Sequence, residues 1–326
     1  MTLDDFADQL KSHDKYLVLS HDGPDADGLG SAYALVIALR SIGKRAMAAV
    51  SDQLPAKFRF IDRQGLFVSL ATEAGFGFPP EEATVIVVDT HDLHYLGARG
   101  AELLKRCARH MVIDHHEARS APGPLLLLES EASSTCELVY LLARSLGAEV
   151  PEDAAEALFA GMVYDTGSFA YAKTGERTFA CARELVALGA KPYKIHREMY
   201  ESSSVAVLIL QKMVFASLEL FAEDRIAVQT LRRTDLSASG ANYEDAEDLV
   251  NRPLIGGTIE VSILFKENLE GRLRCSLRSK GRVNVARIAQ SYGGGGHKTA
   301  AGFTCPEPLE RIKDDVLQSI GKALTA

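Results

Sequence analysis

Short apolar runs alternate with helical patterns along the first half of the chain. Short apolar runs of residues that favour strands, at Tyr16–Ser20, Val85–Val88 and Met111–Ile113, predict strands,. Helical patterns at Ser31–Ile42 and Ala98–Cys107 lie between them,. Apolar strands that alternate with helices are typical of an α/β fold whose parallel sheet is covered on both faces. Ligands in such a fold bind at the carboxyl ends of the strands, near a topological switch point.

The pattern changes around Ala190–Phe221, which is predominantly helical and shows no strand. Beyond it, the pattern predicts four strands, at Arg225–Leu231, Ile259–Lys266, Leu273–Arg278 and Ala300–Thr304,. It also predicts two helices, at Val285–Tyr292 and Leu309–Leu324,. We therefore predict an N-terminal domain with a parallel sheet, a helical connector and a smaller α/β domain, at residues 1–188, 189–222 and 223–326.

Composition narrows the possible functions. The 326 residues are 47% hydrophobic and 25% charged, which is typical of globular protein, and the length favours two domains,. A net charge of −8 argues against a protein that holds long duplex nucleic acid by broad phosphate neutralisation, but not against one small anionic substrate,. The acidic start and the absence of an apolar run of about 18 residues predict a cytoplasmic protein without a membrane partner. The sequence leaves the oligomeric state open.

Five scattered cysteines form no CxxC pair, which favours neither a zinc knuckle nor a disulfide framework,. The first candidate for chemistry is the segment HDGPDADGLGS, directly after a predicted strand. Turns and helix N-caps also collect Asp, Gly and Pro, so a polar turn is the alternative interpretation. Against it, His21, Asp25 and Asp27 crowd into seven residues, where unpaired carboxylates repel one another,. A divalent cation would remove that conflict.

Three further acidic positions follow apolar segments. Asp89 ends the run VIVVD, the triplet Asp114-His115-His116 ends MVID, and Asp165 follows an apolar helical run. Singly, each is also explained by a turn, a cap or a solvated loop. Parallel strands, however, would deliver the first two groups to the same sheet edge as the first motif. An unpaired acid at a helix C-terminus is also unfavourable, because that end is already negative.

Together these positions offer four carboxylates and two neutral imidazoles, which two divalent ions would balance: Asp25, Asp27, Asp89, Asp165, His21 and His115. A carboxylate and imidazole set without thiolate favours Mn²⁺, with Mg²⁺, Co²⁺ and Zn²⁺ as alternatives. Two such ions can activate a nucleophile and brace the oxygens of a phosphoryl group. The pattern therefore predicts phosphoester hydrolysis.

A run of four glycines at 293–296 is followed by His297. A flexible linker is the simple interpretation of such a run. This run is bracketed by a predicted helix and a predicted strand, which linkers rarely are. Its backbone N–H groups could approach an anion, with His297, Arg278 and Ser279 as directed donors,.

The ordered motifs HDGPDADGLGS, VVDTHD, VIDHHE with SSTCELVY, and GMVYDTGSF resemble those of the DHH phosphoesterase superfamily. The stretch SLRSKGRVNVARIAQSYGGGGHKTAAGF resembles the DHH-associated domain of RecJ-like and nanoRNase members. Within the superfamily the chain is most similar to the nanoRNase and pAp-phosphatase group. The resemblance implies an active site in the cleft between the two domains.

The resemblance also implies individual roles. One ion would be held by His21, Asp25 and Asp89, and the other by Asp27, Asp89, His115 and Asp165, so that Asp89 bridges. A metal-bridging water or hydroxide attacks phosphorus in this family. His116 would stabilise the transition state or protonate the leaving oxygen, and Asp114 would orient the histidines. The substrate's nucleotide or phosphate would be held by Arg278, Ser279, Gly295, Gly296 and His297.

The expected activity is hydrolysis of short RNA, of about two to five nucleotides, to 5′-mononucleotides, because an acidic chain offers no extended basic groove. Removal of a phosphate from 3′-phosphoadenosine 5′-phosphate is expected as well. Linear or cyclic dinucleotides such as pApA or c-di-AMP are the alternative substrates, ahead of pyrophosphate or a purely sensory role. Two segments depart from the family pattern: Tyr95-Leu96-Gly97 replaces Arg-Leu-Gly, and Lys173-Thr174-Gly175 replaces Asn-Thr-Thr.

Overall fold

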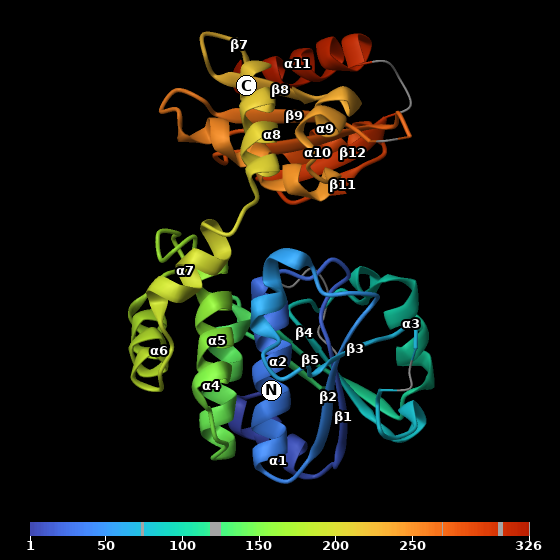
Figure 1. Ribbon diagram of the computed structural model, residues 1–326, viewed down its shortest axis with the longest axis vertical. Helices are drawn as coiled ribbons and strands as arrows, with labels where there is room; N and C mark the ends of the chain where they lie inside the picture. The colour runs from blue at the N-terminus through green and yellow to red at the C-terminus, as the bar shows by residue number, and fades with distance from the viewer. Residues whose placement is uncertain (73–74, 118–124, 269, 306–308, 326) are drawn as a thin grey trace. The chain divides into compact units, whose positions relative to one another are not determined.

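The computed structural model describes residues 1–72, 75–117, 125–268, 270–305 and 309–325 (Figure 1). The chain divides into two compact units, Met1–Ser202 and Ser203–Ala326. The predicted connector, residues 189–222, is shared between them, because α7 (Pro192–Tyr200) belongs to the first unit and α8 (Val205–Ala216) to the second. Among the described residues, no helix combines the length and the apolar character needed to span a membrane.

The first unit contains a six-stranded sheet in which every neighbouring pair is parallel, as predicted. Its strand order is β3-β2-β1-β4-β5-β6. The strands are β1 (Lys15–Leu19), β2 (Arg45–Val50), β3 (Phe67–Ser69), β4 (Thr84–Val88), β5 (Arg109–Asp114) and β6 (Leu126–Leu128). The chain runs outward from β1 to β3 and then returns to β4 on the other side. The topological switch point therefore lies between β1 and β4, where ligands of α/β folds bind.

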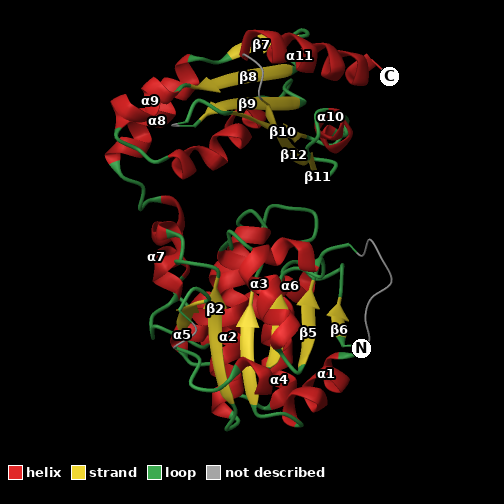
Figure 2. Ribbon diagram, turned by 90° about the vertical axis from the view of Figure 1, so that its right-hand side faces the viewer, coloured by secondary structure: helices red, strands yellow, loops and turns green. Residues whose placement is uncertain are grey.

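Helices cover both faces of this sheet, and Figure 2 shows its strands running side by side among them. Tyr16, Val18 and Ile86 pack on the side of the helices α1 (Leu3–Lys11), α2 (Ala26–Ser41), α4 (Thr135–Leu146) and α5 (Glu152–Asp165). Leu17 and Val85 face the opposite side, toward α3 (Gly97–Arg106). Helix α6 (Glu176–Ala187) and short 3₁₀ turns η1 (Ala56–Ile61), η2 (Pro80–Glu82) and η3 (Leu93–Leu96) complete the unit. Alternation along each strand thus fills two separate cores.

Helix α2 begins at Ala26, five residues before the predicted start at Ser31. The reason is the N-cap: the Asp25 carboxylate accepts hydrogen bonds from the backbone N–H groups of Asp27 and Gly28,. Asp25 therefore caps the helix and Asp27 lies on its first turn, whereas His21 lies in the loop before it.

The second unit contains a mixed six-stranded sheet of order β11-β12-β10-β9-β8-β7. Among the strand pairs that the described residues form in this sheet, only β8 and β9 are parallel. The strands are β7 (Glu219–Phe221), β8 (Ile226–Leu231), β9 (Val261–Glu267), β10 (Leu273–Ser279), β11 (Gly295–Gly296) and β12 (Ala300–Cys305). The helices are α8, α9 (Arg233–Ser239), η4 (Tyr243–Ile255), α10 (Val285–Ser291) and α11 (Leu309–Thr325). The prediction of a segment without strands up to Phe221 was wrong at its end, because Glu219–Phe221 pairs with β8 as an edge strand.

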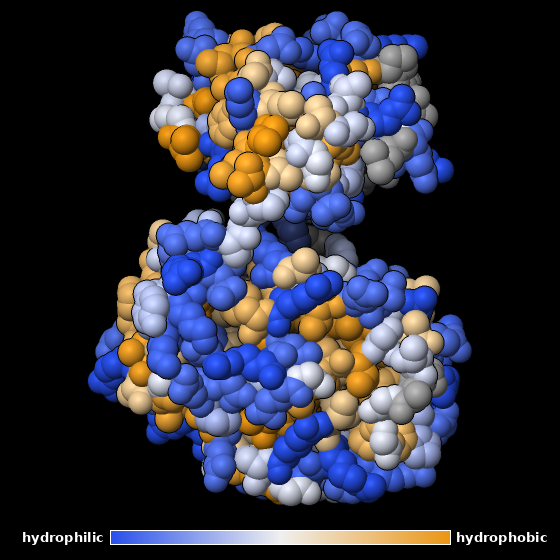
Figure 3. Space-filling view, in the orientation of Figure 1, coloured by the Kyte–Doolittle hydropathy of each residue, from blue (hydrophilic) through white to orange (hydrophobic). Residues whose placement is uncertain are grey.

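Helix α8 buries only one side in this unit. Leu210 and Val214 are fully buried, whereas Val205, Leu208 and Phe215 are exposed. Figure 3 shows hydrophobic residues gathered over this helix. Apolar residues of this helix, which lies in the predicted connector, therefore occupy both a buried side and an exposed side.

Candidate metal centre and phosphoester site

The fold brings the six predicted metal ligands to one edge of the first sheet. His21, Asp89 and His115 follow β1, β4 and β5, and the other three ligands are aspartates at helix ends: Asp25 and Asp27 at the start of α2 and Asp165 at the end of α5. Two groups have all their ligand atoms within 4.8 Å of one another: His21 with Asp25 and Asp89, and Asp27 with His115 and Asp165. A third such group contains Asp89, His115 and His116. Residues from positions 21 to 165 thus converge at the carboxyl ends of parallel strands.

Asp27 is fixed by the start of another helix. Its Oδ2 accepts a hydrogen bond from the backbone N–H of Thr135 at 2.7 Å, and its Oδ1 accepts one from Cys136 at 2.8 Å. These are the first residues of α4, whose N-terminus carries the positive end of the helix dipole,. The carboxylate is fully buried, so its direction is set by the protein and not by solvent.

Asp89 lies between the two groups. Its Oδ2 is 3.6 Å from Nε2 of His21, and its Oδ1 is 3.7 Å from Nε2 of His115. Thr135 donates its hydroxyl to Oδ1 at 3.0 Å. The backbone of Asp89 has a φ of +66°, in the left-handed region that non-glycine residues rarely adopt,. Such strain clusters at functional sites, and here it turns the carboxylate between both groups.

His115 presents one free nitrogen to the carboxylates. Its Nδ1 donates to the carbonyl of Ala132 at 3.3 Å, because a carbonyl oxygen can only accept. When the ring is neutral, as a metal ligand must be, Nε2 is therefore the nitrogen that carries the lone pair. It is buried, and the nearest carboxylate oxygen that the described residues bring to it is Oδ2 of Asp165, at 2.9 Å. A buried imidazole lone pair among carboxylates is what a metal ligand needs.

The electrostatics of the site point to cations. Burial, followed by repulsion from neighbouring carboxylates, raises the pKa of Asp89 well above its ordinary value and also raises those of Asp25 and Asp27. Burial would lower the pKa of His115, but the Asp165 and Asp27 carboxylates raise it to about 9. Without cations the cluster must take up protons to relieve its charge. The donor set of oxygen and imidazole nitrogen fits Mn²⁺ or a similar divalent ion.

Cys136, the nearby sulfur, is not part of this donor set. Its buried thiol accepts a hydrogen bond from Ser31 at 3.3 Å and lies 3.4 Å from the backbone oxygen of Asp27. Burial, with the nearby negative charges, raises the pKa of Cys136 well above its ordinary value. The thiol stays protonated, whereas a metal ligand would be a thiolate.

Asp114 does not face the cluster with a free oxygen. Its Oδ1 accepts hydrogen bonds from the backbone N–H of His116 at 3.1 Å and from Nδ1 of His116 at 2.7 Å, and its Oδ2 accepts one from Nδ1 of His91. Burial would raise the pKa of Asp114, but the hydrogen bonds and charges of His116 and His91 lower it to about 2. The His116 ring is 46% exposed and is oriented by this carboxylate.

His91 and Thr135 were not singled out from the sequence. Both lie within recognised motifs, VVDTHD and SSTCELVY, but no spacing rule indicates that they contact Asp114 and Asp89. Only the folded chain brings them there, across separations of 23 and 46 residues.

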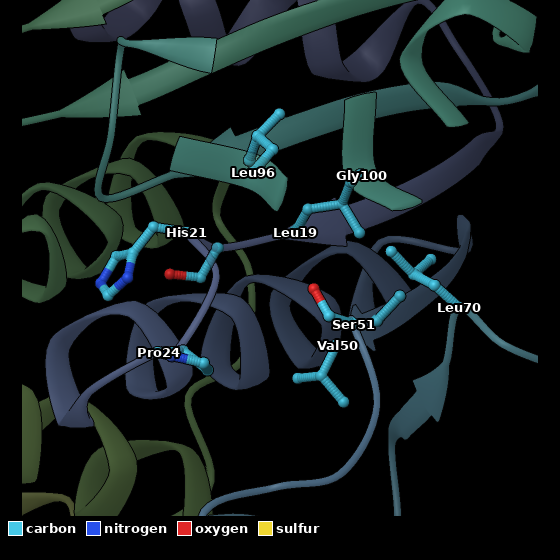
Figure 4. Close-up of a pocket in the computed structure, with 10 residues that line it drawn as sticks. Leu19, His21, Pro24, Val50, Ser51, Leu70, Leu96 and Gly100 are labelled. Carbon is cyan, nitrogen blue, oxygen red and sulfur yellow. The ribbon is translucent and has the colours of Figure 1, made fainter. Parts of the chain in front are cut away.

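A small pocket lies beside the cluster (Figure 4). It is lined by residues at the carboxyl ends of β1 and β2, including His21, Val50 and Ser51, and by Leu96 and Gly100. His21 is the only predicted ligand among its lining residues. The pocket therefore borders the metal cluster on the β2 side and does not enclose it.

The predicted substrate-binding residues gather at one end of the second sheet. Arg278 on β10 pairs with Ala300 of β12, and the next residue of β12, Ala301, pairs with Gly296 of β11. His297 is exposed in the tight turn that follows. Ser279 is buried, and its hydroxyl donates to the backbone oxygen of Val283 at 2.7 Å. The second half of the glycine run, Gly295–Gly296, is thus a strand of this sheet and not a linker, and Ser279 has a turn-forming contact.

Comparisons with known proteins decide the family. A model of the DHH family N-terminal domain matches residues 15–162, and a DHHA1 domain model matches residues 223–325. The chain is 30% identical to a probable bifunctional oligoribonuclease and PAP phosphatase of Streptococcus mutans, over 97% of both chains. The chain belongs to the DHH family. It is a hydrolase of phosphoester bonds, as the motifs predicted.

Further relatives extend this picture. The cyclic-di-AMP phosphodiesterase of Geobacillus thermodenitrificans is 31% identical over 90% of this chain and 45% of its own length. The crystal structure of an exopolyphosphatase-related protein from Bacteroides fragilis superimposes with a TM-score of 0.92 at 25% identity, covering 99% of this chain and 97% of that one. The two-domain DHH and DHHA1 architecture predicted from the motifs is confirmed.

Proposed function

We propose that this DHH protein hydrolyses short oligoribonucleotides of about two to five nucleotides to 5′-mononucleotides, and 3′-phosphoadenosine 5′-phosphate to AMP. The observation that carries the proposal is the position of Asp89, whose two carboxylate oxygens face His21 and His115 in separate ligand groups. The oligoribonuclease and PAP phosphatase from Streptococcus mutans, similar along nearly its whole length, supports the substrate class.

Two divalent ions, with Mn²⁺ preferred, fit the donor set. His21, Asp25 and Asp89 would hold one, and the other would be held by Asp27, Asp89, His115 and Asp165. When bound, such ions polarise phosphoryl oxygens and lower the pKa of water. The protein orients the buried carboxylates by hydrogen bonds. The backbone N–H groups of α4 donate to Asp27, and the Thr135 hydroxyl donates to Asp89.

His116 supplies the proton for the leaving oxygen. Its Nδ1 is bound to Asp114, so Nε2 is the ring nitrogen left to face substrate. The Asp114 carboxylate fixes the orientation of the ring, as the hydrogen-bond partner of a general acid does,. The ring is part exposed, which allows it to reach a bound phosphoester.

In the second unit, Arg278 and His297 would contact the nucleotide or phosphate through charge-assisted hydrogen bonds. Gly295 and Gly296 would present backbone N–H groups, and Ser279 would support the turn beside Arg278 through its contact with Val283. The predicted cytoplasmic location, and short RNA or nucleotide as the partner, form part of this proposal.

A phosphodiesterase acting on pApA or c-di-AMP is the second candidate. The cyclic-di-AMP phosphodiesterase relative favours it, since the aligned region covers 90% of this chain. Both candidates require the same cluster at Asp89, so they differ in substrate and not in the chemistry of the site.

The test uses the full chain, stripped of metal and then supplied with Mn²⁺, and an RNA of three nucleotides as substrate, because pApA is also a substrate of the second candidate. We expect hydrolysis only with the ion present. Asp89→Asn should lose at least about a hundredfold in kcat, because one carboxylate serves both ligand groups. Asp92→Asn is the matched control, since Asp92 is partly exposed and contacts His94 outside the cluster. Full activity without metal, or in Asp89→Asn, would contradict the proposal.

A further inference from the structure

The loop between α5 and α6, residues 166–175, follows Asp165 directly and has a built, strained conformation. Gly167, Ser168 and Phe169 have φ values of 55°, 60° and 66°, all in the left-handed region. Thr166 holds them there: its hydroxyl accepts from the backbone N–H of Phe169 at 2.9 Å. A left-handed backbone conformation at a serine and a phenylalanine costs free energy, and such strained residues cluster at functional sites.

The Phe169 side chain anchors this loop to the first unit. Its ring stacks on Phe179 of α6, with ring centroids 5.4 Å apart, and meets Phe159 of α5 edge-on at 5.8 Å. The residues that follow are therefore presented from a fixed base.

Tyr171 is presented outward by the loop. It is 63% exposed, and its ring packs over Gly167, where an added Cβ would come within 2.4 Å of the ring. Its backbone N–H is held by the carbonyl of Thr166 at 2.9 Å. An aromatic ring with one face supported by the protein and the rest in solvent is a surface on which a nucleobase can stack.

The side chain of Lys173 connects this loop to the predicted metal ligands. Its Nζ donates to the backbone oxygen of His115 at 3.3 Å. The ammonium group is thus anchored on one of the predicted metal ligands, eight residues after another, Asp165. The next side chain, Thr174, has a buried hydroxyl without a hydrogen-bond partner in the described part of the chain.

We propose that the loop 166–175 is a nucleotide subsite, in which Tyr171 stacks on the base next to the scissile bond and Lys173 binds a phosphate adjacent to the scissile one. The inference rests on the proposed function, since it names where that substrate's second nucleotide is held. Lys173 and Tyr171 combine a cation with an exposed ring, the pair of groups that binds single-stranded nucleic acid. Their anchors, His115 and Gly167, keep the subsite beside the cluster.

The test compares Tyr171→Ala and Lys173→Ala with the parent on two substrates in the presence of Mn²⁺. We expect kcat/KM for pApA to fall about tenfold to a hundredfold, mainly through KM, because stacking and phosphate contacts are made in the ground state as well. Turnover of bis(p-nitrophenyl) phosphate, which has no nucleobase or second phosphate, should remain within about twofold, and metal content should be unchanged. Tyr171→Phe and Lys173→Arg should restore most of the loss.

Controls and contrary outcomes separate the loop from the catalytic proposal. Tyr193→Ala and Lys105→Ala remove equally exposed side chains elsewhere in the first unit and should have no effect. If the parent hydrolyses pApA and both loop variants match it, the subsite is wrong while the proposed function stands. Loss of bound metal in the variants would also contradict the subsite, because the loop would then support the metal ligands and not bind substrate. A parent that hydrolyses no dinucleotide would overturn the proposed function itself.

Discussion

Asp89 and Asp114 lie at the ends of neighbouring strands, and yet their pKa values are shifted in opposite directions. Burial and the surrounding carboxylates raise the pKa of Asp89 well above its ordinary value. Burial acts on Asp114 in the same sense, but two histidines donate to it and lower its pKa to about 2. Asp89 therefore needs a cation to balance its charge, whereas Asp114 already accepts hydrogen bonds from two histidines. A bare Asp-His-His triplet in the sequence does not make that distinction.

Metal removal should make stability depend on pH. The raised pKa values of Asp25, Asp27 and Asp89, and the rise of His115 from 6.5 to about 9, mean that metal-free folded protein holds more protons than the unfolded chain. Its free energy of unfolding must therefore fall as pH rises from about 4 to about 9. Bound cations replace those protons.

Thermal unfolding with chelator and with Mn²⁺ measures this effect. The rise in Tm on adding Mn²⁺ should be larger at about pH 7.5 than at about pH 5, where protons already relieve the cluster. A rise that is equal at both pH values would show that the cluster does not hold the ion.

At the scale of elements, the central strands of the first sheet were predictable because they are apolar throughout. Strand β2, with the sequence RAMAAV, was missed because alanine gives little β signal,. Strand β6 is three leucines, too short for periodicity to identify,. In the site, the six candidate ligands could be found from charge crowding at strand ends. The support of Asp27 by Thr135 could not, because that contact spans 108 residues of sequence.

Close packing of α2 on α5 sets the distance between helix-borne ligands, and Gly30 makes it possible. A Cβ at Gly30 would lie 2.4 Å from the backbone oxygen of Ala157. Gly30→Ala must therefore push α2 away from α5 and with it Asp27 from Asp165. We expect a loss of about 1–3 kcal/mol in unfolding free energy, together with lower activity.

Gly321→Ala is the matched control. Gly321 lies in α11, where a Cβ would meet nothing within 4 Å, so alanine should stabilise the helix by about 0.5–1 kcal/mol,. Urea unfolding of both variants measures the difference. A Gly30→Ala protein as stable and as active as the parent would show that α2 and α5 can accommodate the added methyl group without moving the ligands.

At the scale of the whole molecule, charge limits the substrate. With 44 acidic against 36 basic residues the protein carries a net charge of −8, so under the proposed function we expect each phosphate beyond the site to add repulsion without adding a contact,. Tryptophan is absent, and aromatic residues make up 7% of the chain, so few rings remain for stacking beyond a local subsite,. We therefore expect the binding energy to come from the first few nucleotides of the substrate.

Chain length of the substrate should consequently decide the rate. We expect kcat/KM to be highest for RNAs of about two to five nucleotides and to fall at least tenfold for RNAs of about 20 nucleotides, because the added phosphates gain no contacts and meet a net negative surface. Raising the salt concentration screens that repulsion and should narrow the gap, whereas a basic groove would lose long-chain activity with salt. Rates on the two lengths, measured with Mn²⁺ at low and high ionic strength, give the answer. Equal rates at low salt would indicate an extended binding surface of the kind a processive nuclease needs.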